Sequence, residues 1–160
     1  MELRLRNDEG PRLIELLRRV PILYGIEERS LKSLLSDASE ETFPAGHAIV
    51  RDGSLLANLY IILEGRVEVR KKRTVIAKLG KGQFFGEMAF LNDQPTGRSA
   101  DIVATEETRC LSIEGPVWYG FLRKNPDVAI EVIRTLARRL RETDWALSEL
   151  QNLPAPPPKP

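Results

Sequence analysis

The sequence predicts an α+β protein in which helices at both ends flank an antiparallel β segment. Apolar residues recur at helical spacing in residues 11–39 and again in residues 116–150. Between them, residues 43–113 consist of short apolar stretches that glycines interrupt at close intervals. A chain of 160 residues is long enough to bury one core without disulfides or a metal. We therefore expect one domain, residues 11–150, and a proline-rich extended tail, residues 151–160.

The two N-terminal helices of residues 11–39 are predicted from apolar spacing and from proline placement. Pro11 suits the first turn of a helix, and Pro21 suits its end. A second, short helix follows the polar stretch 27–30. The apolar residues at helical spacing are Leu13, Ile14, Leu16, Leu17 and Val20 in the first helix and Leu31, Leu34 and Leu35 in the second.

The β segment, residues 43–113, contains stretches typical of half-buried strands. Val67 and Val69 alternate with Glu68 and Arg70, which indicates one face toward an interior and one toward water. The turn between the first two strands is predicted at residues 64–65. The clearest strands are 59–63, 67–70, 75–79, 101–104 and 109–113. Many short strands of this kind favour a roll, a sandwich or a barrel, and the pattern alone does not choose among them.

The C-terminal helices, residues 116–150, end in a long helix that begins at Pro126 and carries a heptad-like pattern. Its seam residues step alternately by four and by three: Ala129, Ile133, Leu136, Leu140, Thr143, Leu147 and Leu150. Arg139 and Asp144 would then occupy positions that face each other across a parallel two-stranded coil. The spacing favours a homodimer through helix 127–150. The alternative is that these residues dock the helix on its own domain.

Composition excludes several classes of function. The 24 lysines and arginines against 23 aspartates and glutamates give a net charge of +1, so no overall field favours nucleic acid, an anionic membrane or an acidic substrate. No apolar run approaches the roughly 18 residues of a membrane span, and the first residues lack a secretory signal. Cys110 is the single cysteine, which fits a reducing cytoplasm and either a buried apolar role or a redox role.

The segment with the clearest chemistry runs from Phe84 to Ala100. A strand end meets Gly86, and a short helix beginning near Glu87 would present unpaired backbone N–H groups that favour an anion. Arg98 could reach the same anion with its planar guanidinium. The Glu87 carboxylate would repel a phosphate and would instead accept from a neutral donor such as a sugar hydroxyl. Taken singly, Arg98 is an ordinary surface charge and Glu87 an ordinary first-turn acid.

Several motifs in order carry a resemblance to a known family. The central ones are Phe85-Gly86-Glu87-Met88-Ala89 and Arg98-Ser99-Ala100, supported by Pro44-Ala45-Gly46, Gly53, the stretch 60–67 and the stretch 79–84. Over roughly residues 12–150 the sequence resembles the cyclic nucleotide-binding domain family, which includes the ligand domains of the catabolite activator protein and of protein kinase A regulatory subunits. The resemblance implies an antiparallel, jelly-roll-like β-roll with flanking N-terminal helices and a long C-terminal helix.

The resemblance also implies roles for individual residues. Arg98 would pair with the cyclic phosphate, and Glu87 would accept from the ribose 2′-hydroxyl. Ser99 would add a hydroxyl near the phosphate or the base. The backbone of Gly86, Met88 and Ala89 would line the phosphate end, and Val69 and Ile76 would be apolar walls around the purine. In the activator protein's branch, a threonine that follows an Ala-Arg-Arg-Leu stretch contacts adenine, and this chain has Thr143 after such a stretch.

The resemblance implies that base selection rests on Ser99 and Thr143, because the phosphate and ribose contacts are shared by adenine and guanine nucleotides. Members that prefer guanine commonly have threonine after the motif's arginine, so Ser99 favours cyclic AMP over cyclic GMP. Thr143 also has a structural alternative, as a polar seam residue that sets coil register. Trp145 either covers the base or packs at a dimer contact. His47 replaces a usually acidic residue and is expected at the surface.

Two functional hypotheses follow. The first is a regulatory domain that senses a cyclic nucleotide, most simply cyclic AMP, and transmits binding through its C-terminal helix. The second is a dimerisation or interaction module that keeps the fold without binding nucleotide. An enzyme is not expected, because one histidine and one cysteine supply neither a metal site nor a nucleophile with its base. No cofactor, membrane partner or direct DNA binding is expected, so output requires an effector protein or a domain beyond this sequence.

Overall fold

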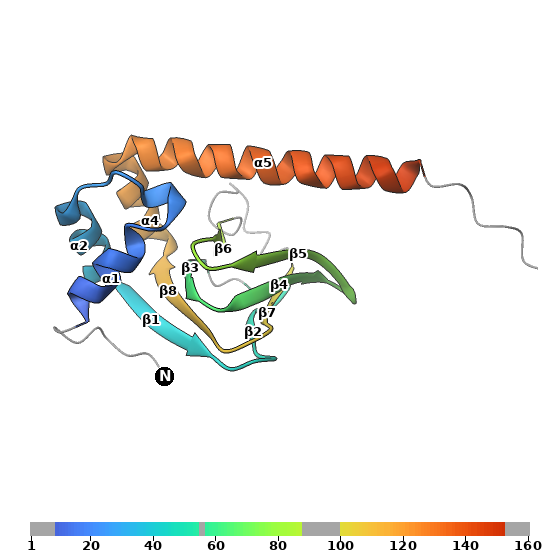
Figure 1. The fold of residues 1–160 in the computed structure, drawn as a ribbon, viewed down its shortest axis with the longest axis horizontal. Helices are drawn as coiled ribbons and strands as arrows, with labels where there is room; N and C mark the ends of the chain where they lie inside the picture. The colour runs from blue at the N-terminus through green and yellow to red at the C-terminus, as the bar shows by residue number, and fades with distance from the viewer. Residues whose placement is uncertain (1–8, 55–56, 88–99, 153–160) are drawn as a thin grey trace, which may run out of the picture.

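The computed structural model describes residues 9–54, 57–87 and 100–152 and has the predicted architecture, a β-roll with helices at both ends (Figure 1). Two antiparallel four-stranded sheets form the roll, in the orders β1-β8-β3-β6 and β2-β7-β4-β5. The strands are β1 (Ala38–Phe43), β2 (Ala48–Val50), β3 (Asn58–Glu64), β4 (Arg66–Lys71), β5 (Thr74–Gly80), β6 (Phe84–Phe85), β7 (Asp101–Ala104) and β8 (Thr108–Glu114). The helices are α1 (Gly10–Leu17), the 3-10 helix η1 (Pro21–Leu23), α2 (Glu28–Ser36), α4 (Gly115–Lys124) and α5 (Pro126–Gln151).

Strand β3 explains how the roll and the helices share one protein interior. Alternate side chains of a strand point to opposite faces, and every residue from Leu59 to Leu63 is buried, so both faces of β3 are covered. Leu59, Ile61 and Leu63 join the cluster that includes α1, α2, α4 and α5. Tyr60 and Ile62 join the cluster inside the roll. The continuous apolar run in the sequence therefore reflects two cores that meet at one strand.

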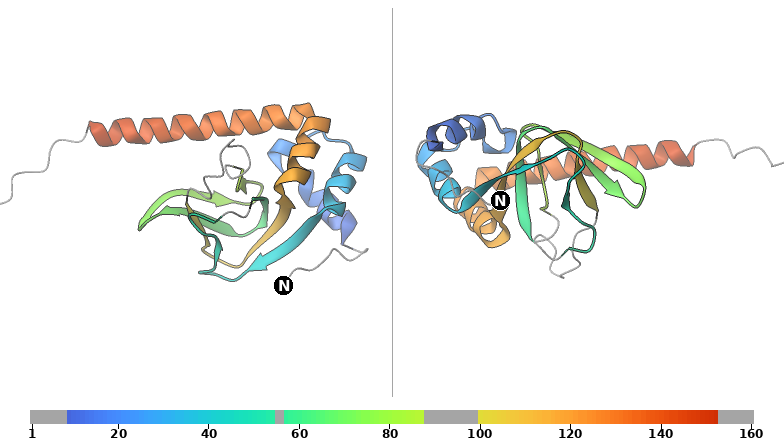
Figure 2. Two further views of the ribbon diagram at one scale, coloured as in Figure 1. Left: turned by 180° about the vertical axis from the view of Figure 1, so that it is seen from behind. Right: turned by 90° about the horizontal axis from the view of Figure 1, so that it is seen from below.

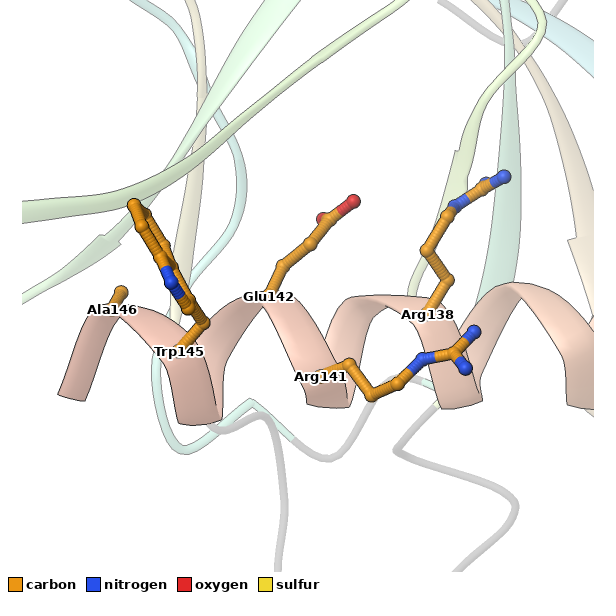
Figure 3. Close-up of a pocket in the computed structure, with 5 residues that line it drawn as sticks. All are labelled: Arg138, Arg141, Glu142, Trp145 and Ala146. Carbon is orange, nitrogen blue, oxygen red and sulfur yellow. The ribbon is translucent and has the colours of Figure 1, made fainter. Parts of the chain in front are cut away.

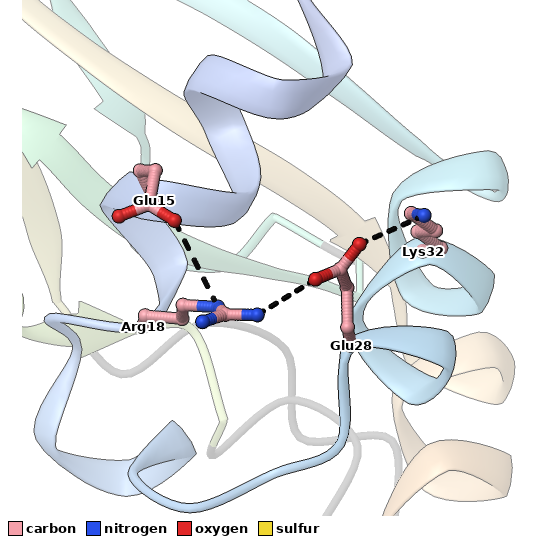
Figure 4. A network of polar contacts seen from close by, with 4 residues as sticks. All are labelled: Glu15, Arg18, Glu28 and Lys32. Carbon is pink, nitrogen blue, oxygen red and sulfur yellow. Dashed lines mark hydrogen bonds and ion pairs between the residues drawn. The ribbon is translucent and has the colours of Figure 1, made fainter.

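The N-terminal helices α1 and α2 are joined at the surface by ion pairs. Their predicted apolar residues are buried, except that Leu16 is partly buried and that Val20 lies just beyond the end of α1. An Arg18 guanidinium nitrogen lies 2.7 Å from a Glu28 carboxylate oxygen, and Lys32 Nζ lies 2.8 Å from the other oxygen of Glu28 (Figure 4). Glu15 approaches Arg18 from within α1 at 4.0 Å. Lys32 and, less strongly, Arg18 lower the pKa of Glu28. Because these groups are exposed, we attribute little stability to them and regard them as orienting α2 against α1.

The first strand, β1, begins earlier than the sequence indicated. The sequence predicts helical structure up to residue 39 and β structure from residue 43, but Ala38–Phe43 pairs in full with β8. The run Ser39-Glu40-Glu41-Thr42 lacks apolar alternation, so no strand signal is visible. Tertiary contacts compensate the charge: Arg109 Nε lies 3.0 Å from Glu40 Oε1, and Arg109 also pairs with Glu64. An edge strand with a cross-strand ion pair does not need a two-residue apolar period.

The long helix α5 uses one stripe to dock and leaves another stripe exposed. Val128 and Val132 are buried in the helical core, and Leu136 packs against it. Four of the predicted seam residues are instead more than half exposed: Ile133, Leu140, Leu147 and Leu150. The two stripes share Leu136, but docking on its own domain does not account for those four exposed leucine and isoleucine side chains. Figure 2 shows the distal half of α5 extending past the helices that flank the roll.

Aromatic and cysteine side chains complete the two cores. Trp118 and Phe121 of α4 stack with ring centroids 5.5 Å apart, and both are buried in the cluster that the helices share. Cys110 of β8 is buried inside the roll, where burial raises the pKa of its thiol to about 12. The thiol therefore stays protonated at neutral pH, which favours the apolar role over the redox role. Across the described residues, no helix is long and apolar enough to span a bilayer.

Candidate functional site

Strand β6 is buried in the core and leads directly into the candidate site. Phe84 and Phe85 are both buried, and they pair with Ile61 and Tyr60 of β3. The ring of Phe85 stacks on Tyr60 with centroids 5.1 Å apart, which fixes the end of the strand. Gly86 follows with φ of 95°, a backbone conformation that glycine adopts without strain and that turns the chain away from the sheet. A larger residue at position 86 would resist that turn.

Glu87 is buried at the point where this turn faces α5. Its side chain is 9% exposed, and one of its oxygens, Oε1, lies 3.8 Å from Nη1 of Arg139. That separation makes the contact an ion pair rather than a hydrogen bond. A buried carboxylate without a nearby cation would be costly, and Arg139 is the cation beside Glu87.

Arg139 links α5 to the roll through three kinds of contact. Its Nη2 donates to the backbone oxygen of Phe84 at 2.8 Å, and its guanidinium lies over the Phe84 ring at 4.6 Å from the centroid. The third contact is the ion pair with Glu87. Burial lowers the pKa of Arg139, and Glu87 acts in the opposite direction. This arginine was expected at a coiled-coil position and was missed as a site residue, although its spacing of four from Thr143 places both on one helix face.

Thr143 lies one turn beyond Arg139 and is exposed. Its hydroxyl donates to the backbone oxygen of Arg139 at 3.0 Å. A hydroxyl has one proton and two lone pairs, so once the proton is used the group presents an acceptor to any further partner. The Thr143 hydroxyl oxygen is therefore able to accept a hydrogen bond from a further donor, whereas its own proton is already used.

The two predicted apolar walls, Val69 and Ile76, are not cross-strand partners in the β4–β5 hairpin. An unbroken hairpin from the pair Lys71 and Thr74 would place Val69 opposite Ile76. A β-bulge shifts the register by one residue, so Val69 pairs with Ala77 and Ile76 is the extra residue. Val69 packs against the cluster inside the roll, whereas Ile76 is 58% exposed.

Four of the predicted site residues, Met88, Ala89, Arg98 and Ser99, lie outside the described residues, as does most of the short helix expected near Glu87. Gly86, Glu87, Val69, Ile76 and Thr143 are described. Of these, Gly86 and Glu87 are adjacent in sequence. Arg139, on the same helix as Thr143, contacts Glu87 and the backbone oxygen of Phe84.

A shallow hollow lies along the distal part of α5. Its lining includes Arg138, Arg141, Glu142, Trp145 and Ala146. Figure 3 shows that Arg138, Glu142 and Trp145 extend on the same side of the helix, whereas Arg141 is directed differently. Trp145 is 69% exposed, so its indole face is available for stacking on a ligand or on a protein surface.

The described residues hold no other arrangement with evident chemistry. They contain no group of three or more histidine, cysteine, aspartate or glutamate side chains suited to a metal ion. His47 is exposed immediately before β2 and stacks on Phe43 with ring centroids 5.5 Å apart. The site is thus defined by a buried carboxylate, a glycine turn and an arginine from a second element, which is an arrangement for binding.

A β-roll that presents such a site to a long C-terminal helix defines a ligand-binding regulatory domain. The family model for the cyclic nucleotide-binding domain matches residues 40–125, so the chain belongs to that family. The family consists of regulatory binding domains and not of catalysts, in agreement with the expectation from the sequence.

Similar proteins agree with this assignment. The chain is 28% identical over 141 residues to a CRP-like cAMP-activated global transcriptional regulator of Mycobacterium tuberculosis, covering 85% of this chain and 62% of that protein. It superposes on the catabolite activator protein of Thermus thermophilus with a TM-score of 0.69 at 32% identity, covering 82% and 63% of the two chains. A cyclic nucleotide-binding domain from Methylobacillus flagellatus has the same fold, with a TM-score of 0.75 at 23% identity over 97% and 90%. The chain thus spans about three fifths of the regulator it matches.

Proposed function

We propose that this protein is a cyclic AMP sensor whose β-roll and α5 together hold the nucleotide. The observation that carries the proposal is the buried Glu87 carboxylate beside the Gly86 turn, paired with Arg139 of α5. A carboxylate in such a position can accept a hydrogen bond from a ribose hydroxyl. Family membership and the name of the Mycobacterium tuberculosis relative support the choice of ligand.

The same contact supports coupling between ligand binding and the position of α5. A ligand changes a conformational equilibrium only when it binds two conformations with different affinity. A nucleotide whose ribose hydroxyl donates to Glu87 adds a partner to that carboxylate. Arg139 already forms an ion pair with the same carboxylate, so the two interactions affect each other. Arg139 also holds α5 to the Phe84 backbone, so a change at Glu87 reaches the helix directly.

Thermal unfolding with separate additions of cyclic AMP and cyclic GMP tests the function. Ligand at 100 times its Kd is expected to stabilise the folded state by about 2.7 kcal/mol. Amide hydrogen exchange in the same samples is expected to change along α5 near Arg139, because the coupling acts there. No shift of the melting temperature with either nucleotide would contradict sensing and favour the alternative, an interaction module without a ligand.

The preference for adenine is proposed to depend on Thr143. The adenine 6-amino group is a donor and the guanine 6-oxygen is an acceptor, whereas the Thr143 hydroxyl, already donating to Arg139, offers an acceptor. Thr143→Val is therefore expected to weaken cyclic AMP binding by about 1 kcal/mol, or roughly fivefold, and to leave cyclic GMP binding unchanged. Isothermal titration calorimetry measures both, with Thr143→Ser as the control that keeps the hydroxyl. An equal loss for both nucleotides would contradict a base contact.

Homodimerisation is proposed through the exposed stripe of α5. Leu140 and Leu147 occupy seam positions and are 62% and 52% exposed, which is unfavourable for a helix left in water. The double substitution Leu140→Glu and Leu147→Glu is expected to convert the dimer to monomer in sedimentation velocity. Ile130→Glu, an exposed site on the same helix outside the seam, is the matched control. A wild-type chain that sediments as a monomer at all concentrations would contradict the proposal.

A further inference from the structure

The hairpin formed by β4 and β5 concentrates positive charge that the rest of the chain lacks. Residues 66–81 contain seven lysines and arginines and one acid, Glu68, a net charge of +6, whereas the whole chain carries +1. The remaining residues therefore sum to −5. A local excess of this size attracts anionic groups even though the protein is nearly neutral overall.

Only part of this charge is neutralised within the chain. Arg70 pairs with Glu68 at 2.7 Å, and Lys71 pairs with Asp52 at 2.9 Å. Lys72, Arg73 and Lys78 are exposed and form no ion pair with any residue that the structure describes. These three cations lie at the tip and along the outer strand of the hairpin.

The turn of the hairpin places a lysine in an unfavourable backbone conformation. Lys71 pairs with Thr74, so Lys72 and Arg73 form a two-residue connection, and Lys72 has φ of 56°. Glycine and asparagine are the residues that such a turn favours, because side chains are disfavoured at positive φ. A lysine there is not explained by the fold of the hairpin.

An exposed apolar residue adjoins the cations. β5 is one of the two edge strands of its sheet, and its residues Thr74–Lys78 are all exposed. Within it Ile76, the extra residue of the bulge, has a side chain that is 58% exposed. Nucleic acid and phosphate would use the cations but not an isoleucine, whereas an acidic protein segment with an apolar residue would use both.

We propose that the β4–β5 hairpin is a docking site for an acidic protein segment, with Lys72, Arg73 and Lys78 contacting its carboxylates and Ile76 contacting an apolar side chain. This surface does not include Glu87 or Arg139. It shares only Ile76 with the residues that the family resemblance assigned to the nucleotide, and in this structure Ile76 is exposed. The hairpin supplies a surface through which an effector protein is recruited.

The test measures fluorescence anisotropy of a labelled peptide of alternating glutamate and leucine, titrated with the full chain. The double substitution Lys72→Glu and Arg73→Glu is expected to weaken binding at least about tenfold. Arg12→Glu with Arg19→Glu, an equal charge change on exposed residues of the N-terminal region, is expected to have no effect. Ile76→Ser is expected to weaken binding a few-fold, whereas Ile130→Ser on α5 is the apolar control.

Three outcomes would overturn the proposal. One is the absence of binding to the peptide. A second is an equal loss in the hairpin variant and its charge-matched control, which would indicate a nonspecific field. The third is tighter binding to duplex DNA or to phosphatidylserine vesicles, with no effect of Ile76→Ser, which would identify a general polyanion site.

Discussion

Arg98→Glu is expected to abolish measurable cyclic AMP binding at micromolar ligand. The sensor hypothesis pairs this guanidinium with the cyclic phosphate, so the substitution removes a charge-assisted contact and adds a repulsive carboxylate. Loss of one partner from a desolvated charge pair costs about 3–5 kcal/mol, which corresponds to a Kd more than a hundredfold higher. Isothermal titration calorimetry measures the change directly.

Two controls make this result specific to the phosphate contact. Arg98→Lys keeps the charge but loses the planar pair of donors, and is expected to retain weak binding. Arg12→Glu alters the net charge equally on an exposed residue of α1 and is expected to bind as the wild type does. Unchanged affinity in Arg98→Glu would remove Arg98 from the site.

Gly65→Ala is expected to destabilise the fold strongly, because the added methyl group collides with a neighbouring strand. Gly65 joins β3 to β4 with φ of 96°, and an added Cβ would lie 2.5 Å from the Thr108 hydroxyl oxygen and 2.6 Å from the Glu107 carbonyl oxygen. Because part of that contact is backbone, the strands must separate. Positive-φ strain and overpacking together cost about 3–5 kcal/mol, and the melting temperature should fall by roughly 10 °C.

Gly46→Ala is the matched control for Gly65→Ala. Gly46 has φ of 84°, but an added Cβ there would meet no atom within 4 Å. Its substitution therefore carries the backbone strain without the collision, and about 1–2 kcal/mol is expected. Urea unfolding compares the two variants. An equal loss of unfolding free energy in the two variants would show that the strands around Thr108 move apart and remove the collision.

The sequence predicted most elements whose signal is local. The strands near residues 59–63, 67–70, 75–79, 101–104 and 109–113 and the long helix from Pro126 all occur within a residue or two of their expected bounds. β1 was missed because Glu40 and Glu41 hide any apolar period, and Arg109 of β8 compensates only after folding. The sequence does not indicate the extra residue at Ile76, because a bulge is not visible in apolar spacing.

For the site, the motif identified Gly86 and Glu87, and the structure supplied Arg139. No pattern around Glu87 indicates which cation neutralises it, because that cation comes from a distant segment. The sequence shows the heptad spacing of α5, but it does not indicate which apolar stripe of the helix packs against the core. Burial of Val128 and Val132 with exposure of Leu140 and Leu147 separated the two stripes.

The types of element, the order of the motifs and the family of the chain all follow from the amino-acid sequence. These depend on side-chain periodicity and on turn residues, which act over a few neighbouring positions. The pairing of Glu87 with Arg139, the exposure of Ile76 and the docking face of α5 follow only from the three-dimensional fold. Each depends on strand register or on packing between distant segments, where a shift of one residue exchanges buried and exposed side chains.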